Sequence, residues 1–266
     1  MRKTFVLLVL TSLAAPLWAG TRVKAHLESY SYKEAWVDVE ASIEDGRLRL
    51  DFQGPWSRGS LIYDRESSQV TIIDHIHRTV LALSQDSQAA LKLIGAIAAN
   101  RLQKEMTGSD PGARAYALVG ENAQAFFNGT PDLRNSNIIK AGFTCDEYQT
   151  ELAGKRAREV WVTTPEKAGM SGEEYDTFRS LAHLVIDLFG MELSQLGADP
   201  TVFQQGLANP QLPVLEVLYA KGRPSGLFKI LQIRSRDFAP GTFDPPAGYQ
   251  TLSLLDLLSE SGNHNP

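Results

Sequence analysis

The most regular hydrophobic pattern in the chain lies between Ala35 and Leu83, where short segments of alternating apolar and polar residues follow one another. Apolar side chains occupy every second position from Val37 to Ile43 and again from Leu48 to Phe52. This period of two is typical of a strand with one buried and one solvated face. Five such segments with no helical pattern between them predict an antiparallel meander.

The residues between these segments have the properties that tight turns require. Asp45-Gly46 favours the positive φ angles of a two-residue hairpin turn, and Gly54-Pro55 interrupts the pairing before the third segment. The last two segments, 70–73 and 79–83, are more uniformly apolar. They are predicted to be strands covered on both faces, with a helix as one candidate cover. The weaker alternation at 21–31 predicts an edge strand that leads into the meander.

Two longer segments change to the helical period. Apolar residues recur at spacings of three and four between Ser84 and Met106. A second helix is predicted over 172–194, because Ser171 and Glu174 form a capping box at its start. Its apolar face is wider than a surface helix needs. Asp199-Pro200 is the kind of pair that opens a short further helix.

The rest of the chain alternates between strand and loop patterns. Hairpins are predicted at 142–163 and at 212–236, with a surface loop at 128–137. The residues from 259 to 266 are predicted to be a disordered tail. No internal repeat and no long linker divides the chain, so residues 20–258 are predicted to form a single domain.

The N-terminal segment has the features of a secretory signal. Basic Arg2-Lys3 precedes an apolar run at 5–13, and small residues lead to Ala19-Gly20. We expect residues 1–19 to be a signal peptide cleaved after Ala19, which predicts a periplasmic protein. The apolar run is short for a membrane span, and no cysteine follows the cleavage site to carry a lipid. An uncleaved membrane anchor is the alternative.

The net charge of the chain limits the classes of partner that we expect. The formal net charge is −5, and removing Arg2 and Lys3 gives −5 − 2 = −7. Nucleic-acid binding relies on a positive patch, so we expect no nucleic-acid partner. No other stretch is long and apolar enough to cross a membrane. We therefore expect a soluble mature protein.

The sequence contains no recognisable catalytic or metal-binding motif, neither G-x-S-x-G, H-E-x-x-H, a phosphate-binding glycine loop nor CxxC. His75 and His77 fall in a predicted turn, where polar residues are expected without a metal. His183 lies in an apolar helix, as a core or interface histidine does, and no partner is evident for His26 or His264. The prediction is a protein that is not an enzyme and has no metal and no cofactor.

Cys145 is the one cysteine, so no internal disulfide forms. A free thiol in an oxidising compartment lasts best when it is buried, and we expect Cys145 to be shielded. The neighbouring carboxylates of Asp146 and Glu147 raise a thiol pKa, which opposes a nucleophilic role.

Three pieces of the sequence together resemble a family of exported bacterial proteins grouped with the LolA/LppX-like lipoprotein-carrier superfamily. The first piece is the meander, with RLRLDFQGP at 47–55 and SLIYDRESSQVTIIDHIHRTVLAL at 60–83. The second is GFTCDEY at 142–148 followed by EVWV at 159–162, similar to a Gly-aromatic-x-Cys hairpin. The third is FDPPAGY at 243–249, similar to a Phe-x-x-Pro-x-Gly-Tyr ending. The residues that define the lipoprotein carriers themselves have no match in this chain.

The resemblance implies an α+β fold, a curved antiparallel half-open β-barrel with helices packed on or plugging its concave face. In the superfamily this concavity holds acyl chains or similar apolar ligands. The apolar residues of the meander and of helix 172–194 are the candidates for lining it. They are Val37, Val39, Leu50, Phe52, Leu61, Tyr63, Ile72, Phe178, Leu181, Val185 and Phe189.

Two interpretations of these residues stay open. They line a cavity for a hydrophobic ligand, such as a lipid or a lipoprotein acyl chain, in a periplasmic binding or carrier protein. Alternatively they fill an ordinary core, and the protein is an envelope interaction or sensor module that binds another protein through its surface. An exported hydrolase is the third and least supported possibility, because no catalytic constellation backs it.

Overall fold

The computed structural model describes residues 20–30, 36–55, 58–83, 131–152, 154–195, 211–220 and 222–253, with the backbone alone for 185, 186 and 188–195. Several sequence predictions lie outside these residues. They are the signal peptide at 1–19, the helix at 84–106, the helix opened by Asp199-Pro200, and the tail at 259–266.

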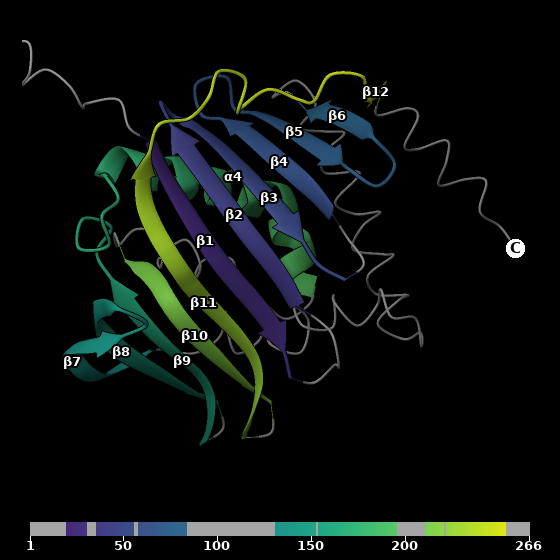
Figure 1. The fold of residues 1–266 in the computed structure, drawn as a ribbon. Coiled ribbons are helices and arrows are strands. Elements are labelled where there is room, and N and C mark those ends of the chain that lie inside the picture. Colours follow the sequence, from purple (N-terminus) through teal and green to yellow (C-terminus); the bar gives the residue numbers. More distant parts are fainter. Residues whose placement is uncertain are drawn as a thin grey trace, which may run out of the picture.

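The described residues form one twelve-stranded sheet, in the order β12-β6-β5-β4-β3-β2-β1-β11-β10-β9-β8-β7. Neighbouring strands are antiparallel, except that β12 runs parallel to β6. The sheet twists and curves without closing into a barrel (Figure 1). The strands are β1 (Gly20–Ser29), β2 (Trp36–Glu44), β3 (Arg47–Gln53), β4 (Arg58–Asp64), β5 (Gln69–Asp74), β6 (Thr79–Leu83), β7 (Asp132–Lys140), β8 (Phe143–Leu152), β9 (Lys155–Thr163), β10 (Leu212–Ala220), β11 (Arg223–Arg236) and β12 (Gln250–Leu252).

The predicted meander is confirmed as β2 to β6, each strand pairing with the next. The turn between β2 and β3 has positive φ at both central residues, 51° at Asp45 and 73° at Gly46. This is the backbone that a two-residue hairpin requires, and glycine adopts it without steric cost. The hairpins β8–β9 and β10–β11 are confirmed as well.

Strand β1 is not the edge strand that its weak alternation predicts. It pairs with β2 on one side and with β11 on the other, and so lies in the middle of the sheet. The alternation of apolar and polar residues indicates which face of a strand is buried, but not how many neighbouring strands it pairs with. The pairing with β11 joins opposite ends of the chain, and no local pattern indicates it.

The surface loop predicted at 128–137 is wrong where the structure describes it. Residues from Asp132 onward form β7, which pairs with β8. The register shifts twice along this pair, and Asn137 has a positive φ of 56°. Because bulges break the period of two, a bulged and exposed strand has the sequence pattern of a loop.

The described part of the chain contains one helix, α4 (Gly172–Gln195), at the predicted position. Its capping box forms: the backbone N–H of Ser171 donates to Glu174 Oε2 (2.7 Å), and that of Glu174 donates to Ser171 Oγ (3.2 Å). The helix lies against one face of the sheet, closest to β2 and β3 (Figure 1). We call this the inner face and the opposite one the outer face. Within the described residues, no helix is both long and apolar enough to cross a membrane.

The outer face of β4, β5 and β6 is covered by residues 237–252, which we call the C-terminal strap. Phe243 of the strap packs with Ile62, Ile73 and Val80 in a second, smaller core. The main core lies on the inner face and includes Val70 and Leu81. Val70 and Leu81 are thus covered on the inner face and Ile73 and Val80 on the outer face, as the sequence predicts, although Ile72 of β5 remains 40% exposed. The outer cover is the strap rather than a helix.

Candidate functional site

The inner face of the meander brings together the candidate residues of β2 to β5. The register places Val39 opposite Phe52, Leu50 opposite Leu61, and Leu61 opposite Ile72. Val37 and Tyr63 share this face because each lies two residues from another inner position. The inner positions of β2, β3 and β4 carry no charged side chain, since the charged residues of these strands point outward.

Burial on the inner face falls from one end of the strands to the other. At the end near the β2–β3 turn, Ile43 and Leu48 are fully buried and Tyr63 is 3% exposed. At the following inner positions, Leu50 and Leu61 are only half-buried, and Ile72 is 40% exposed. Val37, Val39 and Phe52 are half-buried too, and Leu27 of β1, opposite Val37, is 40% exposed. We call the residues of this half the open inner face: Leu27, Val37, Val39, Leu50, Phe52, Leu61 and Ile72.

Helix α4 covers the inner face at the end near the β2–β3 turn. Leu181 is 7% exposed in the main core, and Phe178 packs against that core while half-buried. Tyr63 and Leu181 therefore pack in the core. The side chains of Val185 and Phe189 lie outside the described residues.

Gly59 shapes the open inner face next to Phe52, its partner on β3. A Cβ at Gly59 would lie 2.6 Å from Phe52 Cε2 and 2.9 Å from the carbonyl oxygen of Ile73. The Phe52 ring therefore lies over the backbone of Gly59, in space that only glycine leaves free.

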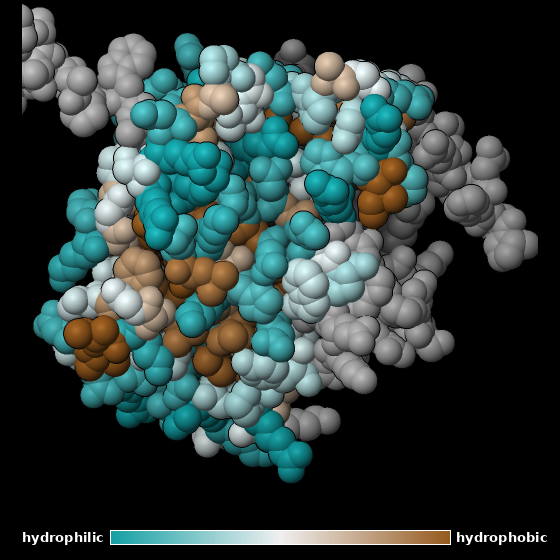
Figure 2. Space-filling model, viewed as in Figure 1, coloured by the Kyte–Doolittle hydropathy of each residue, from teal (hydrophilic) through white to brown (hydrophobic). Residues whose placement is uncertain are grey.

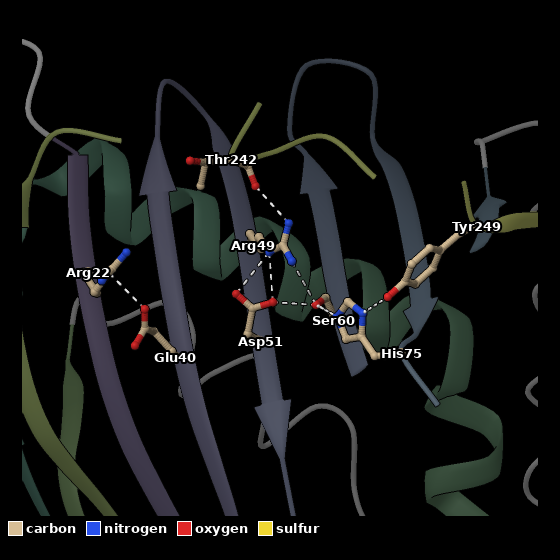
Figure 3. A network of polar contacts seen from close by, with 8 residues as sticks. All are labelled: Arg22, Glu40, Arg49, Asp51, Ser60, His75, Thr242 and Tyr249. Atoms are coloured by element: carbon tan, nitrogen blue, oxygen red, sulfur yellow. Dashed lines mark hydrogen bonds and ion pairs between the residues drawn. The ribbon is translucent and has the colours of Figure 1, made fainter. Parts of the chain in front are cut away.

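The outer face of the meander holds a polar network that the sequence did not indicate (Figure 3). Ser60 is at its centre and is fully buried. Its Oγ lies 2.5 Å from Asp51 Oδ1, 2.7 Å from His75 Nε2 and 3.2 Å from Arg49 Nη2. His75 Nδ1 lies 3.0 Å from the hydroxyl of Tyr249 on the strap.

The direction of these hydrogen bonds follows from Asp51, because an ionised carboxylate can accept hydrogen bonds but cannot donate them. The Ser60 hydroxyl donates to Asp51, so His75 Nε2–H donates to Ser60 Oγ. Burial, helped by the positive charge of Arg49, lowers the pKa of His75 and so favours the neutral imidazole, whose Nδ1 accepts from the Tyr249 hydroxyl. A nucleophilic serine must donate to its histidine, which is the opposite polarity. The arrangement fits a structural clamp between sheet and strap.

His75 and His77 do not converge on a common point. His77 Nδ1 lies 2.7 Å from Asp74 Oδ2, while His75 faces Ser60 and Tyr249. His26, for which the sequence indicated no partner, lies 2.6 Å from Asp38. His183 is half-buried on α4.

Cys145 is buried, 2% exposed, as the sequence predicts. Burial raises the pKa of its thiol, and the charge of Asp146 adds to this effect. Its Sγ lies 3.4 Å from the carbonyl oxygen of Phe143. A thiol in this state is protonated and shielded, which fits a packing role.

No protein-family model matches the chain, and no curated protein matches its sequence. Among solved structures, it resembles an uncharacterized conserved protein from Thermus thermophilus, with a TM-score of 0.40 and 8% identity over 93% of this chain and 98% of that one. In the Pseudomonas aeruginosa MucA/MucB complex the TM-score is 0.37, with 10% identity over 88% of this chain and 58% of that one. This chain thus spans little more than half of that neighbour.

A LolA superfamily protein from Nitrosomonas europaea is also among the similar structures, with a TM-score of 0.25 and 10% identity over 85% of this chain and 89% of that one. All three TM-scores are low. The neighbours therefore include LolA-like and MucB proteins without placing the chain in either family.

Proposed function

We propose that this protein is a non-enzymatic, exported binding protein that holds a hydrophobic or lipid-like ligand against the open inner face of its sheet. The observation that carries the proposal is the fall in burial along the inner face, from fully buried Ile43 and Leu48 to 40% exposed Ile72 and Leu27. An ordinary core closes over such residues. Here the apolar surface continues along the strands beyond the residues that the core buries.

The chemistry of this surface favours an apolar and uncharged ligand segment. Each 100 Å² of apolar surface that a ligand removes from water contributes about 2.5 kcal/mol before the costs of association. A charged group placed over β2, β3 and β4 would lose its hydration without gaining a partner, because the inner positions of these strands are uncharged. An acyl chain has the required properties.

The test is binding of the neutral fluorescent probe N-phenyl-1-naphthylamine, together with solvent extraction and mass spectrometry of protein isolated from the cell envelope. We expect a co-purifying lipid and saturable probe binding. Ile72→Gln should weaken probe binding about tenfold, because it replaces apolar contact with an amide. Ile76→Gln is the matched control, since Ile76 is a 58% exposed isoleucine in the β5–β6 turn.

Protein that is recovered empty and does not bind the probe would contradict the proposal. Equal effects of the Ile72 and Ile76 substitutions would also contradict it. Export is tested separately by sequencing the mature N-terminus, which we expect to be Gly20.

A second candidate function is binding to another envelope protein, and the observation that favours it is the edge strand β7. Within the described residues β7 has a strand neighbour on one side only. Two of its apolar side chains are exposed, Leu133 at 53% and Ile139 at 81%. An open edge of this kind accepts an added strand from a partner. A stoichiometric protein partner whose binding protects β7 from hydrogen exchange, with no lipid recovered, would favour this function over the first.

A further inference from the structure

The outer face contains a second concave site, formed by β1 and β11. It is a cavity of about 400 Å³ that we call the basic pocket, lined by Arg22, Lys24, Gln232, Arg234, Ser235 and Arg236. The antiparallel pairing places Arg22 directly opposite Arg234 and Lys24 opposite Gln232. Arg236 lies two residues beyond Arg234 and so on the same face of the strand.

The basic pocket has more positive charge than its surroundings neutralise. Glu40 of β2 pairs with Arg22 (3.0 Å) and with Lys24 (3.1 Å). Among the described residues, no ion pair joins Arg234 or Arg236 to a carboxylate. Of the four cations, only Arg22 and Lys24 form ion pairs, both with Glu40, in a protein whose formal net charge is −5. Two further carboxylates lie near Arg236: Asp237 follows it in the chain, and Glu44 lies beside Gly20, the partner of Arg236 on β1. Like charges opposite one another on a sheet are destabilising, and a bound anion would relieve this repulsion.

Two of the guanidinium groups are held in place by neighbours. Arg22 Cζ lies 5.7 Å from the centre of the Phe238 ring. Its Nε lies 3.0 Å from Glu40 Oε1, in an ion pair (Figure 3). When the Gln232 amide is turned so that its oxygen faces Arg234, that oxygen accepts hydrogen bonds from Nε and Nη2 of Arg234, both at 3.0 Å. The amide nitrogen of Gln232 is then a further donor. Held in this way, the arginines lose less conformational freedom when an anion binds.

We infer that the basic pocket binds a phosphate group carried by a larger molecule, either a soluble phosphate ester or the headgroup of an anionic phospholipid. A phosphate monoester or the monoanionic phosphodiester of a lipid headgroup offers several oxygens to this cluster of cations, and guanidinium groups bind phosphate oxygens in pairs. A volume of about 400 Å³ leaves room for the group that bears the phosphate. Figure 2 shows the hydrophilic surface that covers the outer face above β1 to β3.

This site is independent of the proposed ligand surface. The basic pocket opens on the outer face and the open inner face lies on the other side of the sheet, so either site can be absent without the other.

The test measures binding of sn-glycerol 3-phosphate by calorimetry, with glycerol as the uncharged comparison. Sedimentation with phosphatidylglycerol vesicles is compared with sedimentation with phosphatidylcholine vesicles. We expect binding to glycerol 3-phosphate, to the anionic phosphatidylglycerol vesicles or to both, and none to glycerol or to zwitterionic phosphatidylcholine vesicles. The double variant Arg234→Gln/Arg236→Gln should weaken binding about tenfold or more. Lys24→Gln, a single change, should weaken it less and serves where the double variant does not fold.

The matched control is Lys155→Gln/Arg223→Gln, which removes two exposed charges at the other end of β9 and β11. Binding of glycerol 3-phosphate alone would indicate that the phosphate belongs to a soluble ester. Sedimentation with phosphatidylglycerol alone would indicate a lipid headgroup. Either result supports the site. Absence of binding in both arms overturns it. Equal loss of binding in the control variant also overturns it, because the attraction would then come from overall charge.

Discussion

The contacts of single residues on the outer face show how polar groups are buried without being left unpaired. Ser60 accepts hydrogen bonds from His75 and Arg49 and donates one to Asp51, which uses the full capacity of a hydroxyl group. Arg49 also donates to the carbonyl oxygen of Thr242 on the strap (3.0 Å). This network is centred on the fully buried Ser60, and a change in the protonation of His75 would alter its hydrogen bonds.

The protonation of His75 should therefore limit stability in mild acid. Its pKa is lowered in the folded protein, so the unfolded chain takes up the proton first as the pH falls below about 6.5. The contribution of His75 to stability is complete above that pH and is lost as the pH falls toward the folded pKa. In urea titrations between pH 7 and pH 5, we expect His75→Gln to remove a slope of up to about 1.4 kcal/mol per pH unit. Identical pH profiles for His75→Gln and the wild-type protein would contradict the prediction.

The C-terminal strap is an element whose position on the outer face cannot be predicted from its sequence pattern. Each of its three aromatic residues meets an arginine of the sheet: Phe238 lies by Arg22, Phe243 by Arg47 and Tyr249 by Arg78. The strap ends in β12, beside β6. It thus joins β1, β3 and β6 across the outer face. The sequence shows the FDPPAGY motif at 243–249 but not where this segment lies on the sheet.

Removing the central aromatic residue of the strap should destabilise the whole sheet. Phe243 is 7% exposed in the outer core, and we expect Phe243→Ala to lower the free energy of unfolding by about 3 kcal/mol, measured with urea. Tyr30→Ala removes an aromatic ring that is 49% exposed and should cost much less. Similar losses for the two variants would mean that the strap contributes little to stability.

At the scale of the whole molecule, the sheet is organised around β1 and not around the meander alone. Strand β1 lies between the meander and the strands of the C-terminal half. It pairs with β2 on one side and with β11 on the other. Both edges of β1 are paired, and its inner residues Val23 and Ala25 are in the main core.

Hydrogen exchange followed by mass spectrometry should reflect this arrangement. We expect peptides from β1 and β11 to exchange most slowly, because their amides are paired within the sheet interior. Peptides from β7 should exchange fastest among the strands, since β7 is exposed and has a neighbour on one side only within the described chain. Protection of β7 equal to that of β1 would contradict the position of β7 at the sheet edge.

Features that depend only on neighbouring residues could be predicted from the sequence. Asp45-Gly46 predicts its hairpin because only a few residue types adopt positive φ, and Ser171 and Glu174 predict the start of α4 because they satisfy free backbone amides. Period-two alternation also placed Val39, Leu50 and Leu61 on one face, because side chains alternate along any strand.

The tertiary structure decided the features that depend on which strands meet. The pairing of β1 with β11 places Arg22 beside Arg234, and the fold of the strap places Tyr249 beside His75. These residues are far apart in the chain, and alternation is the same for any partner strand. The extent to which α4 covers the inner face was likewise settled by packing, because a half-covered leucine such as Leu50 and a buried one such as Leu48 have the same place in the sequence pattern.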